Sequence, residues 1–396
     1  MTMKKYLIFL LFLTGACIQE PDTHSYELQI VVDFGESVPI DDFSGAIVKL
    51  SNQTKNYAVQ QTTNEQGVVR FLDIEPGFYS VTVTHSISSA GIVYYYNGLK
   101  TIDVLSSLTD TIPVSESKTN AFVIKEYYYV GCLTEAGKAY SSDQYVEIYN
   151  NTDAIQYADG FSIIEHESYA TEENYWKDIS DTIVARMIWT IPGTGYDVPV
   201  KAGESIILAR DGIDHKDDPN GNPLCPVNLG TADFEFYVEW TTDKDIDSPT
   251  VENLDEDLFV FRGSDISFHT RGGSAIAIAK IPGSNQDERL EYINNHLISK
   301  ASSSGSDGRY YGMVANEYII DAVEVTWDES HAIYKRFPVE LDAGYTYVEA
   351  GSKSGKCVRR KISKITEDGR VIYQDTNNST EDFLKGVDPK PKVYEE

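Results

Sequence analysis

Apolar and polar residues alternate along most of the chain after residue 25. The runs "YELQIVVDF", "GAIVKLSN" and "FYSVTVTHS" are rich in β-branched and aromatic residues, and Gly, Pro and Asn separate them. A period of two indicates strands, because successive side chains of a strand point to opposite faces of the sheet. We therefore expect a β-sandwich over residues 26–118.

The second half of the chain repeats this pattern. Runs such as "DQYVEIYNN", "SIILARDG" and "GGSAIAIAK" recur through residues 121–388, and the polar stretch "PVSESKTN" at 113–120 separates them from the first set. The best helical pattern is at residues 285–301. The chain is therefore predicted to be all-β, with two β-sandwich domains.

The first residues have the features of an export signal. Lys4 and Lys5 precede a short apolar run, and "LTGAC" ends at Cys17. The run is too short to span a bilayer as a helix. We expect residues 1–16 to be a signal peptide, Cys17 to be lipidated as in a bacterial lipobox, and residues 17–25 to be the lipid-anchored tether. Ordinary secretory cleavage near residue 16 is the alternative.

Net charge limits the possible binding partners, and the number of cysteines limits the possible disulfides. The formal net charge of −29 repels nucleic acid and anionic lipid, so we expect no nucleic acid partner and membrane attachment only through the lipid anchor. Besides Cys17 the chain has Cys132, Cys225 and Cys357. This odd number excludes a complete disulfide framework and leaves open either one bridge or three buried thiols.

Two sets of motifs resemble known families. The segment "TNEQGVVRFLDIEPGFYSVTV" resembles the carboxypeptidase regulatory-like, or transthyretin-like, β-sandwich, a module that has no catalytic residues. In order, "YVEIYNN", "DGF", "KAG" and "DTNNSTEDF" resemble a lamin-tail-like sandwich, whose fold is immunoglobulin-like. Together they resemble a Bacteroidota-type lipoprotein family of unassigned function. The lamin-tail match is thin near 166–190 and 212–320, which we interpret as loop insertions that carry function.

The stretch "KCVRRKISKITEDGRVIYQDTNNSTEDF" near the end of the chain is predicted to close the second domain. It lacks the spacing of a phosphate loop and the Gly and Glu of an EF-hand. As a strand, it turns Val358 and Arg360 toward the core and Arg359 outward. A buried guanidinium needs a carboxylate, and Asp375 or Asp382 from the following loop would supply it. An anion-binding patch on the outward face is the alternative.

The loop "ARDGIDHKDDPNGNPLC" is the densest group of possible metal ligands. Oxygen ligands on a Gly- and Pro-containing loop suit calcium, and a histidine beside carboxylates suits a transition metal. The candidate ligands are Asp211, Asp214, His215, Asp217 and Asp218. In so acidic a chain, a solvated acidic loop is the alternative.

Aromatic runs offer candidate binding surfaces. The runs "VYYYNG" and "KEYYYVG" each hold three consecutive tyrosines, so at least one ring of each is expected to leave the core. Packing of the two domains on each other is the alternative. The candidate binding aromatics are Tyr94, Tyr95, Tyr96, Trp176, Trp189 and Trp240, of which the tryptophans could instead form small loop cores.

No catalytic motif is recognisable, so we expect a protein that is not an enzyme. The segment "EHES" at 165–168 lacks the spacing of a zinc protease, and no nucleophile elbow occurs. Thr111 and Thr182 lie in "DTI" segments that resemble a short O-glycosylation motif of exported Bacteroidota proteins.

These features predict a non-catalytic binding lipoprotein of the outer membrane, surface-exposed or on its periplasmic face. We expect it to be accessory to an uptake system, with a TonB-dependent barrel as partner. A structural or adhesive surface protein is the alternative, and a glycan-acting hydrolase is a third class. The first predicts a concave pocket among the insertions, the second a flat exposed surface without one, and the third two carboxylates facing each other across a cleft.

Overall fold

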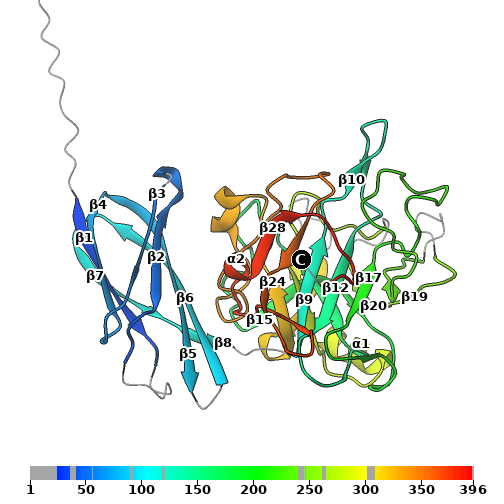
Figure 1. The fold of residues 1–396 in the computed structure, drawn as a ribbon, viewed down its shortest axis with the longest axis horizontal. Helices are drawn as coiled ribbons and strands as arrows, with labels where there is room; N and C mark the ends of the chain where they lie inside the picture. The colour runs from blue at the N-terminus through cyan, green and yellow to red at the C-terminus, as the bar shows by residue number, and fades with distance from the viewer. Residues whose placement is uncertain are drawn as a thin grey trace, which may run out of the picture.

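The structure, a computed structural model, describes residues 25–35, 42–55, 57–89, 92–117, 121–239, 245, 247–260, 265–300 and 308–394. Strands dominate it and form two domains that lie side by side (Figure 1). The all-β prediction is confirmed. No described helix is long and apolar enough to cross a membrane.

The first domain is a sandwich of two sheets. The smaller sheet has the order β4 (Val68–Ile74), β1 (Tyr26–Asp33) and β7 (Leu108–Pro113). The larger has the order β3 (Tyr57–Thr62), β2 (Ile47–Asn52), β5 (Gly77–Ser89), β6 (Ile92–Val104) and β8 (Ser115–Ser117). Apolar side chains from both sheets, such as Leu28 and Val48, meet in one core. This arrangement explains the strict alternation in β2, where every second residue is buried.

The second domain contains two larger sheets. The one we call the clasp sheet has the order β19 (Glu252–Asn253), β18 (Phe234–Glu235), β17 (Ser205–Ala209), β12 (Tyr145–Asn150), β9 (Phe122–Tyr128), β25 (Cys357–Arg360) and β28 (Phe383–Val387). The other, the pocket sheet, has the order β22 (Leu297–Lys300), β23 (Arg309–Ala315), β15 (Thr182–Thr190), β14 (Ser162–His166), β21 (Ile276–Ala279) and β24 (Ile319–Val323). The strand β20 (Asp255–Phe259) also pairs with β15.

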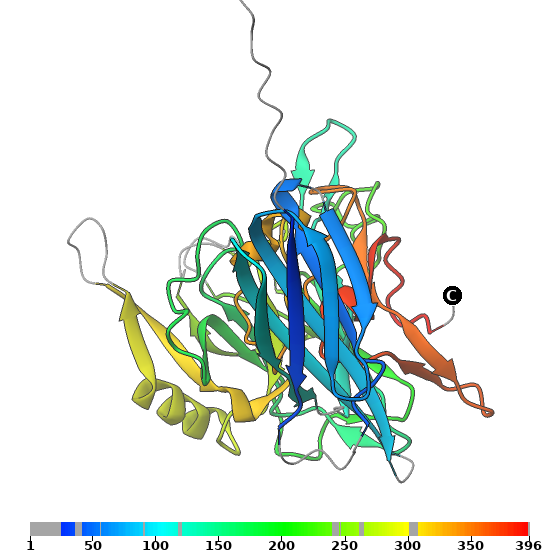
Figure 2. The ribbon, with the colours of Figure 1, turned by 90° about the vertical axis from the view of Figure 1, so that its left-hand side faces the viewer.

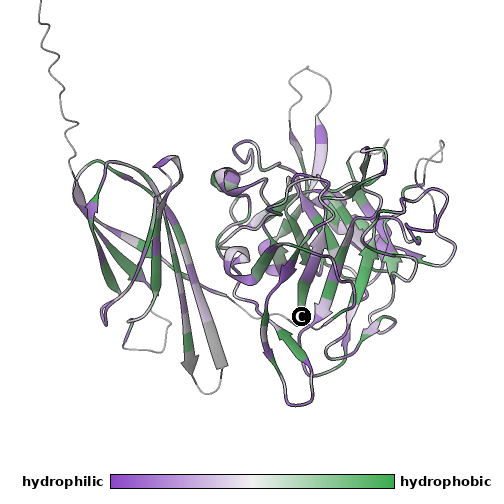
Figure 3. Cartoon of the chain, turned by 45° about the horizontal axis from the view of Figure 1, so that its top comes forward, coloured by the Kyte–Doolittle hydropathy of each residue, from purple (hydrophilic) through white to green (hydrophobic). Residues whose placement is uncertain are grey.

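The described chain also contains short helices and two-stranded ribbons. The described helices are α1 (Gln286–Asn295), α2 (Ser379–Asp382) and the 3₁₀ turns η1 (Gln53–Lys55), η2 (Asn316–Tyr318) and η3 (Glu329–Tyr334). Two-stranded ribbons are β10 (Cys132–Leu133) with β11 (Ala139–Tyr140), β13 (Gln156–Tyr157) with β16 (Pro199–Val200), and β26 (Ile362–Ile365) with β27 (Val371–Tyr373). Hydrophobic residues concentrate on the strands inside the domains (Figure 3).

The interpretation of residues 166–190 and 212–320 as loop insertions is wrong. They supply β15, β20, β21, β22 and β23, which form most of the pocket sheet. Both faces of this sheet are covered: Ile163 faces the clasp sheet, whereas Ile164 packs in a second core with Ile293 of α1. A strand that is buried on both faces has apolar residues at successive positions. It therefore lacks the alternation of apolar and polar residues that indicated the other strands.

The helix predicted over residues 285–301 is shorter than expected and covers only Gln286–Asn295. Asn285 caps its N-terminus, where the side chain accepts a hydrogen bond from the backbone N–H of Glu288. The helix ends at Asn295, because Leu297–Lys300 pairs antiparallel with β23 instead. Strand pairing thus overrides the helical pattern of the last turn.

The tyrosine run of β9 is buried throughout, contrary to the expectation that one ring would leave the core. Tyr127, Tyr128 and Tyr129 are each at most 1% exposed. The strand lies inside the clasp sheet, and the C-terminal segment covers that sheet's outer face, where the backbone N–H of Lys390 donates to Glu126. Both sides of the strand are therefore interior.

The tyrosine run of β6 lies at the junction of the two domains. The side-chain amide of Asn97 donates to the carbonyl oxygen of Thr376, at 2.6 Å. Burial raises the pKa of Tyr95, and the carboxylates of Asp382 and Asp375 in the second domain raise it further. Figure 2, seen from the first domain, shows its strands crossing in front of the second. This part of β6 packs one domain on the other.

Candidate ligand-binding site

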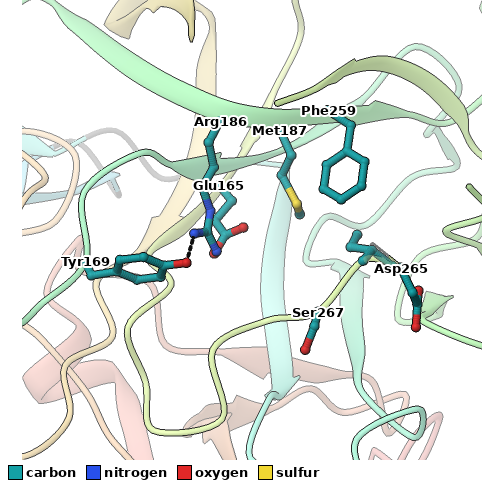
Figure 4. A pocket seen from close by; sticks show the side chains of 8 residues that line it. Glu165, Tyr169, Arg186, Met187, Phe259, Asp265 and Ser267 are labelled. Atoms are coloured by element: carbon teal, nitrogen blue, oxygen red, sulfur yellow. Dashed lines mark hydrogen bonds and ion pairs between the residues drawn. The ribbon is translucent and has the colours of Figure 1, made fainter. Parts of the chain in front are cut away.

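A pocket of about 240 Å³ opens in the second domain beside the pocket sheet (Figure 4). Strands β14, β15 and β20 provide one side, and the segment 265–267 provides the other. The lining residues are Glu165, Tyr169, Arg186, Met187, Phe259, Asp265, Ile266 and Ser267. All of them lie in or beside the regions that the sequence analysis assigned to loops with a functional role.

A β-bulge aims Arg186 into this site. Glu165 of β14 pairs with Met187 of β15, whereas the next residue, His166, pairs with Ala185. Arg186 is therefore the extra residue of β15 at this point, and a bulge redirects the side chain of its extra residue. Since Met187 pairs in turn with Phe259 of β20, the row Glu165, Met187 and Phe259 runs across three strands along the pocket.

The polar end of the pocket is a buried ion pair. The guanidinium of Arg186 donates to the carboxylate of Glu165 and to the hydroxyl of Tyr169, and it lies 4.4 Å from the centre of the Tyr169 ring. Both charged side chains are at most 5% exposed. Burial by itself lowers the pKa of Arg186, but the adjacent Glu165 outweighs burial and raises it. Arg186 therefore stays charged and oriented.

The remaining lining is mainly apolar. Met187 of β15 and Phe259 of β20 line the cavity on the strand side (Figure 4), and Ile266 lines it on the side of the segment 265–267. The second carboxylate of the lining, Asp265, forms an ion pair with Arg210. The pocket therefore joins an apolar wall to an end with fixed donors and acceptors, which is the usual composition of a small-molecule site.

An aromatic stack continues from Tyr169, and the sequence analysis missed it. The rings of Tyr169 and His269 have centres 5.3 Å apart, and His269 stacks on Trp327 at 5.6 Å with nearly parallel planes. The guanidinium of Arg271 lies 5.2 Å from the Trp327 ring centre. No sequence pattern links these three rings, because they come from separate segments and only the folded chain brings them together.

Three of the six predicted binding aromatics are buried in the interior. Trp189 is fully buried between the sheets, and Trp176 is 6% exposed and packs against Tyr311. Tyr96 is 3% exposed and packs against Phe34 in the first domain. These side chains are core residues, because the regions that hold them are strands or pack on strands. The side chain of Tyr94 and the whole of Trp240 lie outside the described residues.

The acidic loop does not gather its five candidate ligands. Asp214 and Asp218 accept hydrogen bonds from backbone N–H groups two residues later, so they close local turns. His215 is fully buried, and its Nδ1 contacts the hydroxyl of Tyr140 at 2.8 Å. Asp217 is exposed to solvent. The carboxylates of Asp214 and Asp218 thus accept hydrogen bonds from the loop's own backbone. The five candidate ligands do not come together as the calcium site that the sequence suggested.

Asp211 alone of the five turns toward other carboxylates. It shares with Asp245 and Asp265 a group of oxygen atoms that lie within 4.8 Å of one another. Burial raises the pKa of Asp211 to about 6 and that of Asp245 to about 7. Arg210 already neutralises Asp265 here. Burial therefore disfavours three negative charges at this place.

Arg360 lies where the sequence placed it, in the interior beside the loop that follows. It is 2% exposed, and its guanidinium lies 3.2 Å from both Asp375 and Asp382. A third carboxylate, Asp321, lies at 2.7 Å and was not foreseen, since it belongs to β24 of the pocket sheet. The four side chains form a closing clasp between the two sheets.

Arg359 differs from its predicted outward position. Its side chain is 13% exposed and pairs with the fully buried Glu126 of β9, at 3.3 Å. Cys357, on the same face of β25, is fully buried. Both faces of β25 are covered because the C-terminal segment passes over the clasp sheet, and so Arg359 is held by an ion pair and is not part of an open anion-binding patch.

The modification sites predicted from the sequence divide between described and undescribed residues. Thr111 lies on β7 with an exposed side chain, and Thr182 begins β15 with a partly exposed one. Cys17 lies outside the described residues. Lipidation and glycosylation therefore stay predictions.

Comparison with known proteins finds similarity to a family without an assigned function. Residues 201–390 match the model of a family described as "Protein of unknown function (DUF4876)". Among solved structures, the chain is similar to the crystal structure of a DUF4876 family protein from Bacteroides thetaiotaomicron. The two share 27% sequence identity with a TM-score of 0.60, over 92% of this chain and 96% of that one. No curated protein matches.

Proposed function

We propose that this protein is a non-catalytic binding lipoprotein whose second domain holds a small ligand in the pocket beside Arg186. One observation carries the proposal: a concave site joins a preorganised Arg186–Glu165 pair to an apolar wall. A flat adhesive surface would not require such a site. This favours binding over a purely structural role.

The chemistry of the lining suggests the class of ligand. A guanidinium next to a carboxylate offers donors and acceptors to a zwitterion, and Met187 and Phe259 offer contact to an apolar group. The volume of about 240 Å³ lies below the roughly 300–1,000 Å³ of drug-sized sites. We therefore expect a single apolar amino acid, or the end of a peptide, as the occupant.

Catalysis is less well supported than binding. A glycan hydrolase needs one carboxylic acid that keeps its proton and a second carboxylate facing it. Glu165 is occupied by Arg186, and Asp265 by Arg210. Each carboxylate thus has a permanent cationic partner, which disfavours the proton transfers that hydrolysis requires.

The cellular setting rests on the sequence and on family resemblance. A lipid on Cys17 and the tether to residue 25 would confine the body to the outer membrane, which raises its effective concentration toward embedded partners such as a TonB-dependent barrel. The similar protein from Bacteroides agrees with the resemblance to Bacteroidota-type lipoproteins. In this arrangement the first sandwich acts as a spacer and the second presents the pocket.

The proposal is tested by titrating the purified chain with leucine, phenylalanine and short apolar peptides, followed by calorimetry. Ser267→Trp fills the pocket and should abolish the heat of binding, whereas Ser299→Trp on exposed β22 should leave it unchanged. No heat with any of these ligands, together with hydrolysis of a glycan, would replace binding by catalysis. Co-isolation of a membrane barrel after mild solubilisation tests the accessory role separately.

A further inference from the structure

Two cysteines and one aspartate meet in the interior of the second domain. Cys132 lies on β10, Asp143 precedes β12, and Cys225 belongs to the long loop after β17. Their ligand atoms lie within 4.8 Å of one another, and all three side chains are buried. The two sulfur atoms are 3.5 Å apart.

The carboxylate of Asp143 lacks a cation that would balance it. It is fully buried, and the part of the chain that the structure describes gives it no ion pair. Its Oδ2 accepts hydrogen bonds from the hydroxyl of Tyr128 at 2.8 Å and from the thiol of Cys225 at 3.4 Å. Its Oδ1, equally buried, has no partner. A buried oxygen left without a partner is uncommon and costs free energy.

We propose that Cys132, Cys225 and Asp143 bind one zinc ion. Zinc is bound by thiolates, imidazoles and carboxylates, and three such protein ligands leave the fourth tetrahedral position to water. Sulfur ligands select such a borderline-soft ion over calcium. Binding releases the two thiol protons to solvent, so the net charge of the cluster is unchanged, and gives the carboxylate of Asp143 a cation to coordinate.

The separation of the two sulfurs fits this ion better than a direct bond. Two thiolates bound at about 2.3 Å to a tetrahedral zinc have sulfurs about 3.8 Å apart. A disulfide would bring them to about 2.05 Å. The observed 3.5 Å is close to the first value and needs only a small outward movement of the sulfurs.

Surrounding contacts hold the ligands in place. The side-chain amide of Asn222 donates to the sulfur of Cys132 at 3.1 Å and to the carbonyl of Leu133 at 3.1 Å. The backbone N–H of Cys225 donates to the carbonyl of Asn222 at 2.9 Å. Donors to the sulfur stabilise a thiolate, and such outer contacts orient metal ligands. The ion would fasten the loop that carries Cys225 to the ribbon of β10 and β11.

The test uses the full chain, reduced, freed of metal with a chelator and titrated with zinc sulfate against a chromophoric zinc indicator. One zinc per chain is expected, and zinc should raise the melting temperature. Cys132→Ser, Cys225→Ser and Asp143→Asn should each weaken affinity by at least about 100-fold, since outer contacts alone are worth about 10–100-fold. Cys357→Ser, a buried cysteine outside the cluster, should bind zinc as the wild type does.

Cobalt gives a second readout that does not depend on stability. Cobalt bound to the reduced chain should show a thiolate charge-transfer band, which both cysteine variants lose and Cys357→Ser retains. The proposal is overturned if the reduced wild type takes up no stoichiometric zinc. It is also overturned if folded Cys132→Ser or Cys225→Ser binds zinc as tightly as the wild type, or if Cys357→Ser weakens binding as much as they do.

Discussion

The guanidinium of Arg360 lies 2.7 Å from the carboxylate of Asp321, although the first belongs to the clasp sheet and the second to the pocket sheet. The same carboxylate accepts a hydrogen bond from the backbone N–H of Ile124, at 2.6 Å. Burial raises the pKa of Asp321 to about 7 and that of Asp382 to about 6, although Arg360 opposes both shifts. A single cation therefore joins three buried carboxylates and holds the two sheets in register.

Replacement of Arg360 by Met should strongly destabilise the second domain. Removal of one member of a buried pair costs about 3–5 kcal/mol, because the partner charges stay buried. Urea denaturation followed by tryptophan fluorescence measures this change. The exposed pair of Lys201 and Glu204 provides the control, and Lys201→Ala should change the free energy of unfolding by less than about 1 kcal/mol. Similar small changes in both variants would contradict the clasp.

Stability should fall in acid partly through His166. Burial and, to a smaller extent, the nearby guanidinium of Arg336 lower its pKa to about 3. The unfolded chain, with a histidine pKa of about 6.5, then binds more protons than the folded chain between pH 6.5 and 3. His166 therefore contributes stability that is present above pH 6.5 and is lost as the pH falls.

The variant His166→Gln separates this contribution from those of other groups. Between pH 6.5 and 4.5 the wild type should lose about 2–3 kcal/mol more unfolding free energy than the variant. Denaturant titrations at a series of pH values give both slopes. Parallel slopes would show that His166 is not held neutral in the fold. Glu324 partly opposes the shift and is present in both proteins, so it does not affect the comparison.

Two tryptophans should respond differently to truncation. Trp189 is fully buried between the sheets, so Trp189→Ala should cost about 3–5 kcal/mol of stability. Trp327 stacks on His269 beside the pocket, so Trp327→Ala should cost less and should weaken ligand binding. Thermal unfolding and calorimetry of both variants check this. A larger loss of stability in Trp327→Ala would reverse the two roles.

Cys17→Ser should release the protein from the membrane fraction. The lipid on Cys17 is predicted to be its attachment, and Cys17 precedes the first described strand, which starts at Tyr26, so the melting temperature should stay the same. Fractionation and a thermal scan of the soluble part measure both quantities. A Ser variant that stays wholly in the membrane fraction would require another anchor.

The local alternation of apolar and polar residues was sufficient to predict several features of this protein. Strict alternation identified β1 and β2, because each has one face in the core and one in solvent. The alternation that turned Val358 toward the core indicated that Arg360 turns inward too, and Asp375 and Asp382 of the following loop were its expected partners. These inferences needed only neighbours in sequence.

Only the tertiary structure shows the contacts between segments that are far apart in the sequence. Residues 182–190 lie in a segment interpreted as a loop insertion, yet they form β15. The sequence shows no period of two here, because both faces of the sheet are covered and nearly every residue of the strand is buried. Arg186 owes its position to a bulge, and Asp321 reaches Arg360 from the opposite sheet. Likewise, Cys132 and Cys225 are 93 positions apart and meet only in the folded chain. Sequence fixes which groups are available, but the packing of one sheet on another determines which of them meet.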